Sequence, residues 1–441
     1  MADIAQHSVL LPMIEDHLDA AAFTSHLWER ALVSPLCGIG RVAVDQERRL
    51  LSSLEGLGLG GAVTTEQVLM PALDDEDPRR AFAGALALLE RDGTDAVSEI
   101  GKRLEDPKKR ATAMRALGLS ANGEIEGLLR RMVGQRTSSL APALEVLAFR
   151  GARLGPEIGD LLCETDPAVL AAALLAARAS GKGPGGGVSR LRINAALESS
   201  EAAVRDAGIE LGLMHGMQSA WAASRKAVES GALGNGTAAL VLAMSGESSD
   251  LNLLLSALAN KDHRAAVLFA LGFCGRAEAA QACLEHMKDP KAARIAGEAF
   301  SAITGLELRG ELCVEEDRKR KKLVPLEEDD LDANLVPGPE KDLPVPNVAG
   351  VEQWWSKNRT RFNPALRYVN GLALNGSALI EAFRSATMRR RHALAFEIAV
   401  RTRGEVRIET RTWAKLQLAV DARLGDAASA AVMLPFGELL N

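Results

Sequence analysis

The stretch EDPKKRATAMRALG, residues 105–118, carries the signals of one short helix. The pair Asp106–Pro107 is a typical helix start, because the Asp carboxylate can accept hydrogen bonds from the free amides of the first turn and proline has no N–H to leave unpaired. Met114 and Leu117 then fall on one face of the helix, and Gly118 is suited to end it. The stretch therefore predicts a capped helix with one buried stripe.

Similar sequence motifs recur along the chain at nearly regular intervals. Seven steps cover the 212 residues from Asp77 to Asp289, close to thirty residues per unit. Thirty residues accommodate two short helices and two turns, and such a hairpin must stack on its neighbours to bury its apolar face. The sequence therefore predicts an all-α fold, an α-solenoid of HEAT-like helical hairpins over residues 74–306. The motifs begin at Asp77, Asp106, Arg136, Asp166, Ser200, Gly231, Asp262 and Asp289.

The segments on either side of the repeats differ from them in composition. Residues 1–73 contain amphipathic stretches that indicate an N-terminal helical cap. Residues 307–350 form a charged, proline-rich linker with a basic run at 318–322 and an acidic run at 327–332. Residues 351–441 are predicted to form a basic, mostly helical C-terminal cap region, with a helix at 351–362 and a hairpin whose two helices are joined by TMRR.

Composition and charge restrict the class of partner and the compartment. The net charge of −6 argues against general affinity for nucleic acid or an anionic membrane. Five scattered cysteines indicate a reducing compartment, and the N-terminus has no basic region of the kind that begins a signal peptide. We therefore expect a cytoplasmic protein with a protein partner, no nucleic acid and no membrane. The oligomeric state is not indicated.

Catalytic and cofactor motifs are weak in this sequence. The glycine-rich GKGPGGG, residues 181–187, lacks the spacing of a phosphate-binding loop and is predicted to be an inter-helix loop. Cys283 and His286 are three residues apart on a predicted helix, but with Cys274 they provide too few ligands for zinc. We therefore expect no enzyme, no catalytic residue, no cofactor and no metal.

The C-terminal region holds the strongest candidates for a partner-binding surface. From 351 to 424 there are fourteen Lys and Arg against six Asp and Glu, a net charge of +8. Aromatic and arginine side chains are common anchors of protein interfaces. Two alternatives remain open: the tryptophans can be buried in a C-terminal cap, and the arginines can be solvated or paired with the acidic linker. The candidate partner-binding residues are Trp354, Trp355, Phe362, Tyr368, Arg389, Arg390 and Arg391.

Several segments resemble one protein family when they are taken in order. They are the segments ERRLLSSLEGLGLGG, SAITGLEL, LPVPN, QWW, RFNPALRYVNG and RRRHALAFEIA. Together they resemble a proteobacterial family of HEAT-repeat proteins of uncharacterised function, often encoded in or near type VI secretion gene clusters. SSLEGL stands here in place of the His-Leu-Asp-Gly-Leu-like word expected for that family, and no catalytic residue is carried over. The resemblance implies a cytoplasmic accessory or adaptor role in secretion, through effector loading or assembly.

Two hypotheses about function follow from these observations. The first is a non-enzymatic scaffold that presents a long curved surface to a protein partner. The alternative is an enzyme on a HEAT-like scaffold, similar to a DNA glycosylase or a chromophore lyase. The repeats from 74 to 306 carry 27 Lys and Arg against 29 Asp and Glu, and this balance disfavours a DNA-binding groove within them.

Overall fold

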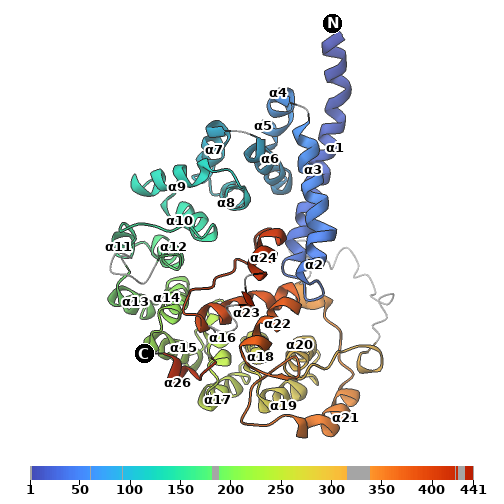
Figure 1. The fold of residues 1–441 in the computed structure, drawn as a ribbon, viewed down its shortest axis with the longest axis vertical. Helices are drawn as coiled ribbons and strands as arrows, with labels where there is room; N and C mark the ends of the chain where they lie inside the picture. Colours follow the sequence, from blue (N-terminus) through green and yellow to red (C-terminus); the bar gives the residue numbers. More distant parts are fainter. Residues whose placement is uncertain are drawn as a thin grey trace, which may run out of the picture.

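The computed structural model describes residues 2–59, 61–91, 93–180, 188–314, 338–422, 424–425 and 433–440, with the backbone alone for 2–10 and 93. The glycine-rich stretch 181–187 and the charged runs at 318–322 and 327–332 lie outside the described residues. The repeats form an arc of helical hairpins, and the C-terminal helices lie inside the arc (Figure 1). The fold is an all-α, HEAT-like α-solenoid, as the sequence predicted.

The repeat helices alternate between an inner layer, which faces the centre of the arc, and an outer layer. The inner helices are α6 (Pro78–Arg91), α8 (Arg110–Leu119), α10 (Leu140–Phe149), α12 (Pro167–Ala177), α14 (Ala202–Met214), α16 (Thr237–Met244), α18 (Arg264–Cys274) and α20 (Ala293–Thr304). The outer helices are α7 (Gly93–Lys102), α9 (Glu124–Gly134), α11 (Ile158–Leu161), α13 (Arg190–Leu197), α15 (Gln218–Glu229), α17 (Ser248–Ala257) and α19 (Ala277–His286). Each predicted start precedes one inner helix, so the thirty-residue period is confirmed.

The Asp-Pro motifs begin their helices in two different ways. At Asp166 the carboxylate accepts from the amides of Ala168 and Val169, and the helix begins at the next residue, Pro167. At Asp106 the carboxylate accepts from the amide of Lys108, and a turn precedes the helix. The helix begins only at Arg110, whose amide donates to the carbonyl of Asp106 at 2.8 Å. The helix therefore begins later in the sequence than predicted, because the motif at Asp106 forms a turn before it.

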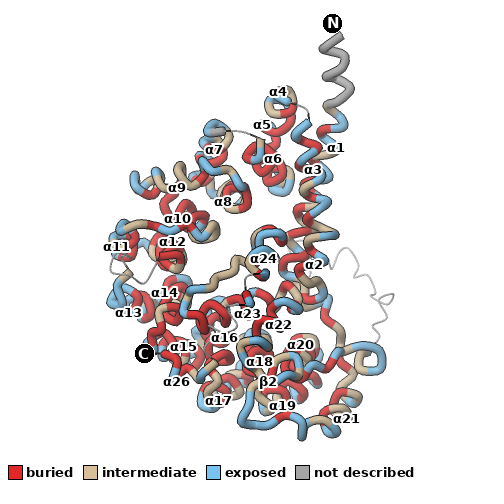
Figure 2. The backbone as a smooth tube through the Cα atoms, viewed as in Figure 1, coloured by how far each residue is buried: buried red, intermediate tan, exposed pale blue. Residues whose placement is uncertain are grey.

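The N-terminal region consists of one long helix and a broken second one that packs beside it. Its elements are α1 (Ala2–Ala31), α2 (Ile39–Arg41), a π-helical segment (Val42–Glu47), α3 (Arg48–Gly58), α4 (Gly61–Thr64), a second π-helical segment (Thr65–Leu69) and α5 (Met70–Ala72). Both α1 and α3 contact α6, so this region covers the open apolar face of the first repeat. Figure 2 shows buried residues where these helices face one another.

The C-terminal region is mostly helical and extends well beyond the last repeat. Its elements are 3₁₀ turns at Gly310–Leu312, Pro339–Asp342 and Arg359–Arg361, α21 (Val348–Asn358), β1 (Tyr368–Val369), β2 (Leu372–Ala373), α22 (Gly376–Ser385), α23 (Met388–Arg401), α24 (Ala414–Asp421) and α26 (Phe436–Leu439). Helix α21 contacts α19 and β1 contacts α20, so this part covers the last repeat. Helices α22, α23 and α24 then cross the inside of the arc toward α1 and α2 (Figure 1).

The crossing helices join the two ends of the arc. The amide of Met388 donates to the carbonyl of Cys37 at 2.8 Å. The Trp413 and Trp28 rings lie 4.8 Å apart, and the Glu47 carboxylate accepts from both the Trp28 indole and the amide of Ala414. The C-terminal region therefore links the N-terminal cap to the repeats.

A short β-hairpin attaches this region to the ends of α18 and α20. Asn370 and Gly371 have φ angles of 49° and 79°, as a tight hairpin turn requires, and β1 pairs antiparallel with β2. The amide of Tyr368 donates to the carbonyl of Gly275 at 2.7 Å. A Cβ on Gly275 would lie 2.5 Å from the Tyr368 carbonyl oxygen, and the residue has a φ of 73°. Only glycine fits both the left-handed backbone and the close approach.

We predict that Gly275→Ala lowers the melting temperature by several degrees. The methyl group would displace the hairpin, and the positive φ adds roughly 1 kcal/mol of strain. Thermal unfolding of the purified protein measures the effect. Gly134→Ala is the control, because its Cβ would meet open space and its φ is not positive. Equal melting of the two variants would contradict the importance of this contact.

Candidate functional site on the concave face

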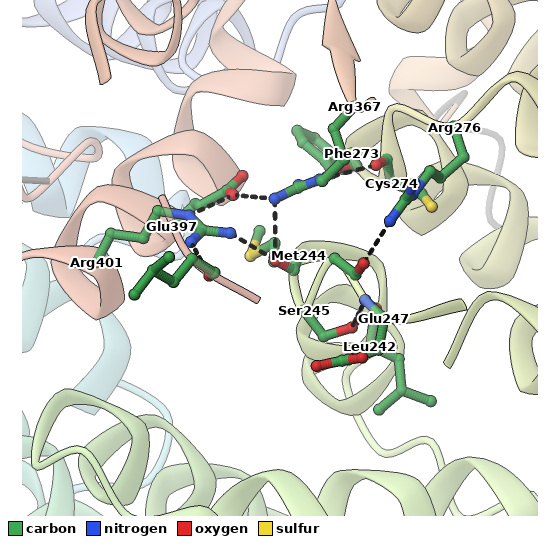
Figure 3. Close-up of polar contacts among 12 residues, drawn as sticks. Leu242, Met244, Ser245, Glu247, Phe273, Cys274, Arg276, Arg367, Glu397 and Arg401 are labelled. Carbon is green, nitrogen blue, oxygen red and sulfur yellow. Dashed lines mark hydrogen bonds and ion pairs between the residues drawn. The ribbon is translucent and has the colours of Figure 1, made fainter. Parts of the chain in front are cut away.

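The inner helices point their carboxyl ends at the C-terminal region. The last carbonyls of a helix have no partner within it, and they carry the negative end of the helix dipole. Arg367 donates to the carbonyls of Phe273 and Cys274 at the end of α18 and to that of Met244 at the end of α16 (Figure 3). One guanidinium therefore satisfies the ends of two neighbouring repeats.

A second arginine completes this network. Arg401 is almost fully buried and donates to the carbonyl of Met244 at 2.8 Å (Figure 3). The carboxylate of Glu397, also buried, pairs with both Arg401 and Arg367 at 2.9 and 3.2 Å. Buried ion pairs are stable only when their remaining donors find acceptors, and the helix ends supply them here. These arginines therefore serve to hold α23 against the repeats.

We predict that Arg367→Met lowers the free energy of unfolding by about 3 kcal/mol or more, because three carbonyls and a buried carboxylate lose a charged partner. Denaturant unfolding measures the loss. The control is Arg309→Met, whose side chain is 79% exposed and forms an ion pair with Glu307, itself 70% exposed. Equal unfolding of both variants would show that the network is dispensable.

The predicted aromatic anchors are part of the interior. Trp355 is 5% exposed, and its indole N–H donates to Gln281 Oε1 on α19 at 2.9 Å. Its ring lies 5.4 Å from both Phe300 and Phe362, and Phe362 lies 5.0 Å from Tyr368. Trp354 is partly buried and stacks on Trp355 at 6.5 Å. Of the two interpretations, burial over the last repeat is the one that the structure shows.

The predicted arginine run lies in the first turn of α23, and not in a loop between helices. This differs from the predicted TMRR connection because only Ala386 and Thr387 separate α22 from α23. All three side chains bind within the chain, and Arg391 is completely buried. Their partners are Glu298 for Arg389 at 3.2 Å, the Gly272 carbonyl for Arg390 at 3.0 Å, and Asp421 for Arg391 at 3.0 Å. The run is therefore not an exposed anchor for a partner.

A groove remains open between the first repeats and the end of the C-terminal region. It has a volume of about 830 Å³ and is lined by α3, α6, α8 and α10 on one side and by residues 408–420 on the other. Its apolar lining includes Leu51, Leu86, Phe149 and Leu416, of which Leu416 is 48% exposed.

Most basic groups of the groove are already occupied. Arg91 donates to the carbonyl of Leu57, and Arg150 donates to those of Leu117 and Ser120. Glu55 and Glu90 lie on the same wall, are exposed, and have no ion pair within the described residues. This wall, formed by α3 and the first repeats, therefore presents apolar side chains beside exposed carboxylates.

A smaller cavity of about 270 Å³ adjoins the groove, and the two share Phe149, Arg150, Ile408 and Glu409. It lies between α10, α12, α14, α16 and α23. Arg178 and Glu210 line it and form an ion pair at 2.7 Å. Burial raises the pKa of Glu210, against the effect of Arg178.

His392 lines the same cavity, and its Nδ1 lies 3.1 Å from the Thr410 hydroxyl. The residue is exposed, and it lines two cavities that are enclosed by other segments of the chain. Loss of hydration, together with the charges of Arg411 and Arg178, lowers the pKa of His392 to about 4. The imidazole is therefore neutral at physiological pH.

This shift predicts a pH dependence of stability. The unfolded chain takes up the His392 proton below about pH 6.5, but the folded protein resists protonation until about pH 4. The contribution is therefore complete above pH 6.5 and is lost as the pH falls to 4. We expect His392→Gln to lose less stability than the wild type between pH 7.5 and 4.5, measured by denaturant unfolding. Parallel pH profiles would contradict the shift.

Two further observations concern the class of site. Within the described ranges, no group of three His, Cys, Asp or Glu side chains is placed to hold a metal ion. No helix in the part of the chain that the structure describes has the length and apolar character needed to cross a bilayer.

The sequence analysis missed the residues that organise this face. Arg367 and Arg401 have no local signature, because the helix-end carbonyls that they bind are 93 to 157 residues away in the sequence. The hairpin did carry a signal, since Asn370–Gly371 is the dipeptide that tight hairpin turns favour. That signal would have placed a turn before α22.

The fold and its cavities define a HEAT-like α-solenoid whose concave face is partly filled by its own C-terminal region. Comparison with protein-family models gives no match, and neither does comparison with curated proteins. Among solved structures, the chain is similar to human deoxyhypusine hydroxylase in complex with glycerol, with 20% identity and a TM-score of 0.25. That match covers 66% of this chain and 99% of the other. A likeness at this level says nothing about activity, and the fold assignment rests on the helices described above.

Proposed function

We propose that this protein is a non-enzymatic scaffold that holds a short segment of a protein partner in the groove on its concave face. The observation that carries the proposal is the groove itself, about 830 Å³ in volume and left open by a C-terminal region that fills much of the same face. α-Solenoids commonly bind partners along their concave surface.

The charges of the groove indicate the chemistry of the partner segment. The exposed Leu416 and the partly buried Leu51 and Phe149 suit apolar side chains. The exposed carboxylates of Glu55 and Glu90, which have no ion pair within the described residues, favour lysine or arginine beside them, since complementary charge fixes orientation and partner choice. The proposed occupant is therefore an amphipathic segment with basic side chains flanking its apolar ones. The resemblance to the secretion-associated family makes a secretion component or an effector our candidate source of that segment.

The groove predicts which surface changes affect binding. Leu416→Gln removes an apolar anchor, and Glu90→Lys reverses a charge on the opposite wall. Each is expected to weaken partner binding about tenfold or more, corresponding to roughly 1.4 kcal/mol. The matched controls are Leu191→Gln, at a leucine that is 73% exposed, and Glu229→Lys, at an exposed glutamate on the outer helix α15.

The experiment is a pull-down from the native host with the wild type and the four variants, each with a thermal melt. A protein retained by the wild type and both controls but lost with both groove variants supports the proposal, and its affinity is then measured with purified components. Retention of the same proteins by all five chains would contradict the groove as the binding site. Identification of a type VI secretion component or effector by mass spectrometry would support the secretion role.

A further inference from the structure

The small cavity beside the groove contains an arginine that the fold does not pair. Arg407 lies on the segment between α23 and α24 and lines the cavity that Arg178 also lines. It is partly buried, and neither a carbonyl nor a carboxylate binds its guanidinium within the described residues. Other arginines on this face, such as Arg150, Arg367 and Arg401, donate to helix ends or to carboxylates. Arg407 therefore differs from Arg150, Arg367 and Arg401 in having no acceptor within the described residues.

The surroundings of Arg407 make the absence of a partner energetically unfavourable. Removal of water lowers its pKa, and the positive charges of Arg178 and Arg153 lower it further. A charge taken out of water is stable only when it is paired, so an unpaired guanidinium reduces the stability of the empty protein. An anion in the cavity would reverse that penalty.

We propose that this cavity binds a small carboxylate ligand with a short apolar body, held by Arg407 and Arg178. A guanidinium presents a planar set of donors that matches a carboxylate. The apolar part of the lining, with Leu175, Met214 and Leu240, suits a hydrocarbon chain. The cavity shares four lining residues with the groove, but Arg407 and Arg178 line the cavity alone, so this proposal is tested separately from the one for the groove.

The charge balance favours a monoanion over a phosphate. Five ionisable side chains besides His392 line the cavity, three arginines and two glutamates, so the arginines outnumber the carboxyl groups by one. The two negative charges of a phosphate dianion would exceed this excess of one positive group. The dianion would also be repelled by the two carboxylates. The volume of about 270 Å³ also limits the ligand to a small molecule or one terminal residue. The five groups are Arg150, Arg178, Arg407, Glu210 and Glu409.

The carboxylate has two possible sources, a free small molecule or the C-terminus of a peptide. Calorimetry and thermal shift with the full-length protein separate them. The probes are hexanoate, its neutral analogue hexanamide, inorganic phosphate, and a short peptide ending in leucine with either a free or an amidated C-terminus. We expect saturable binding of hexanoate, of the free-acid peptide, or of both, and none of either amide.

Variants test the role of Arg407 directly. Arg407→Gln is expected to reduce carboxylate affinity at least tenfold, and Arg407→Lys less. The control Arg359→Gln, at an exposed arginine in the turn after α21, is expected to bind like the wild type. Without ligand, Arg407→Gln is expected to melt at the same temperature as the wild type or higher, because no contact is lost.

Four results would overturn the proposal. They are equal binding of hexanoate and hexanamide, tighter binding of phosphate than of any carboxylate probe, unchanged affinity in Arg407→Gln, and no binding of any carboxylate probe. A lower melting temperature of ligand-free Arg407→Gln would likewise show that the arginine serves the fold. The groove proposal is unaffected by these results, since its test uses Leu416 and Glu90.

Discussion

The carboxyl ends of the inner helices set the main constraint on this structure. Each inner helix ends in carbonyls that lack a partner within the helix, and stacking aligns these ends along the inside of the arc. Covering that edge requires donors, and the chain supplies many of them as arginines: Arg150 for α8, Arg401 for α16 and Arg367 for both α16 and α18. In the C-terminal region, Arg367, Arg390 and Arg401 are used in this way.

The same constraint explains where binding sites remain. Over α16, α18 and α20 the helix ends are covered by α23 and the hairpin, and the concave face there is filled. At the first repeats, Arg150 donates to the carbonyls at the end of α8, Arg91 donates to a carbonyl at the end of α3, and α24 lies across the groove from them. Binding capacity is therefore concentrated in the first half of the arc, and the basic C-terminal surface proposed from sequence is mostly interior.

What could be predicted from sequence follows from the range of the interactions. The inner helices were located because each depends on local signals, such as the carboxylate of Asp166 and the apolar stripe that follows. The position of Trp355 could not be derived, since its partner Gln281 is 74 residues away. The groove could not be predicted either, because residues 408–420 form one of its walls and no local sequence pattern shows where these residues cross the arc. Arg407 looks like any surface arginine until the fold places it in a cavity.

The joining of the two ends of the arc has a consequence for biosynthesis. The amides of Ala414 and Lys415 bind Glu47, 367 and 368 residues earlier in the chain. During translation the repeats therefore leave the ribosome long before the segment that braces them, and the inner edge is hydrated by water in the meantime. Contacts between residues so far apart in sequence form slowly, because a long loop must close first. The link between the two ends of the arc is accordingly completed only after synthesis of this segment, in a late docking step.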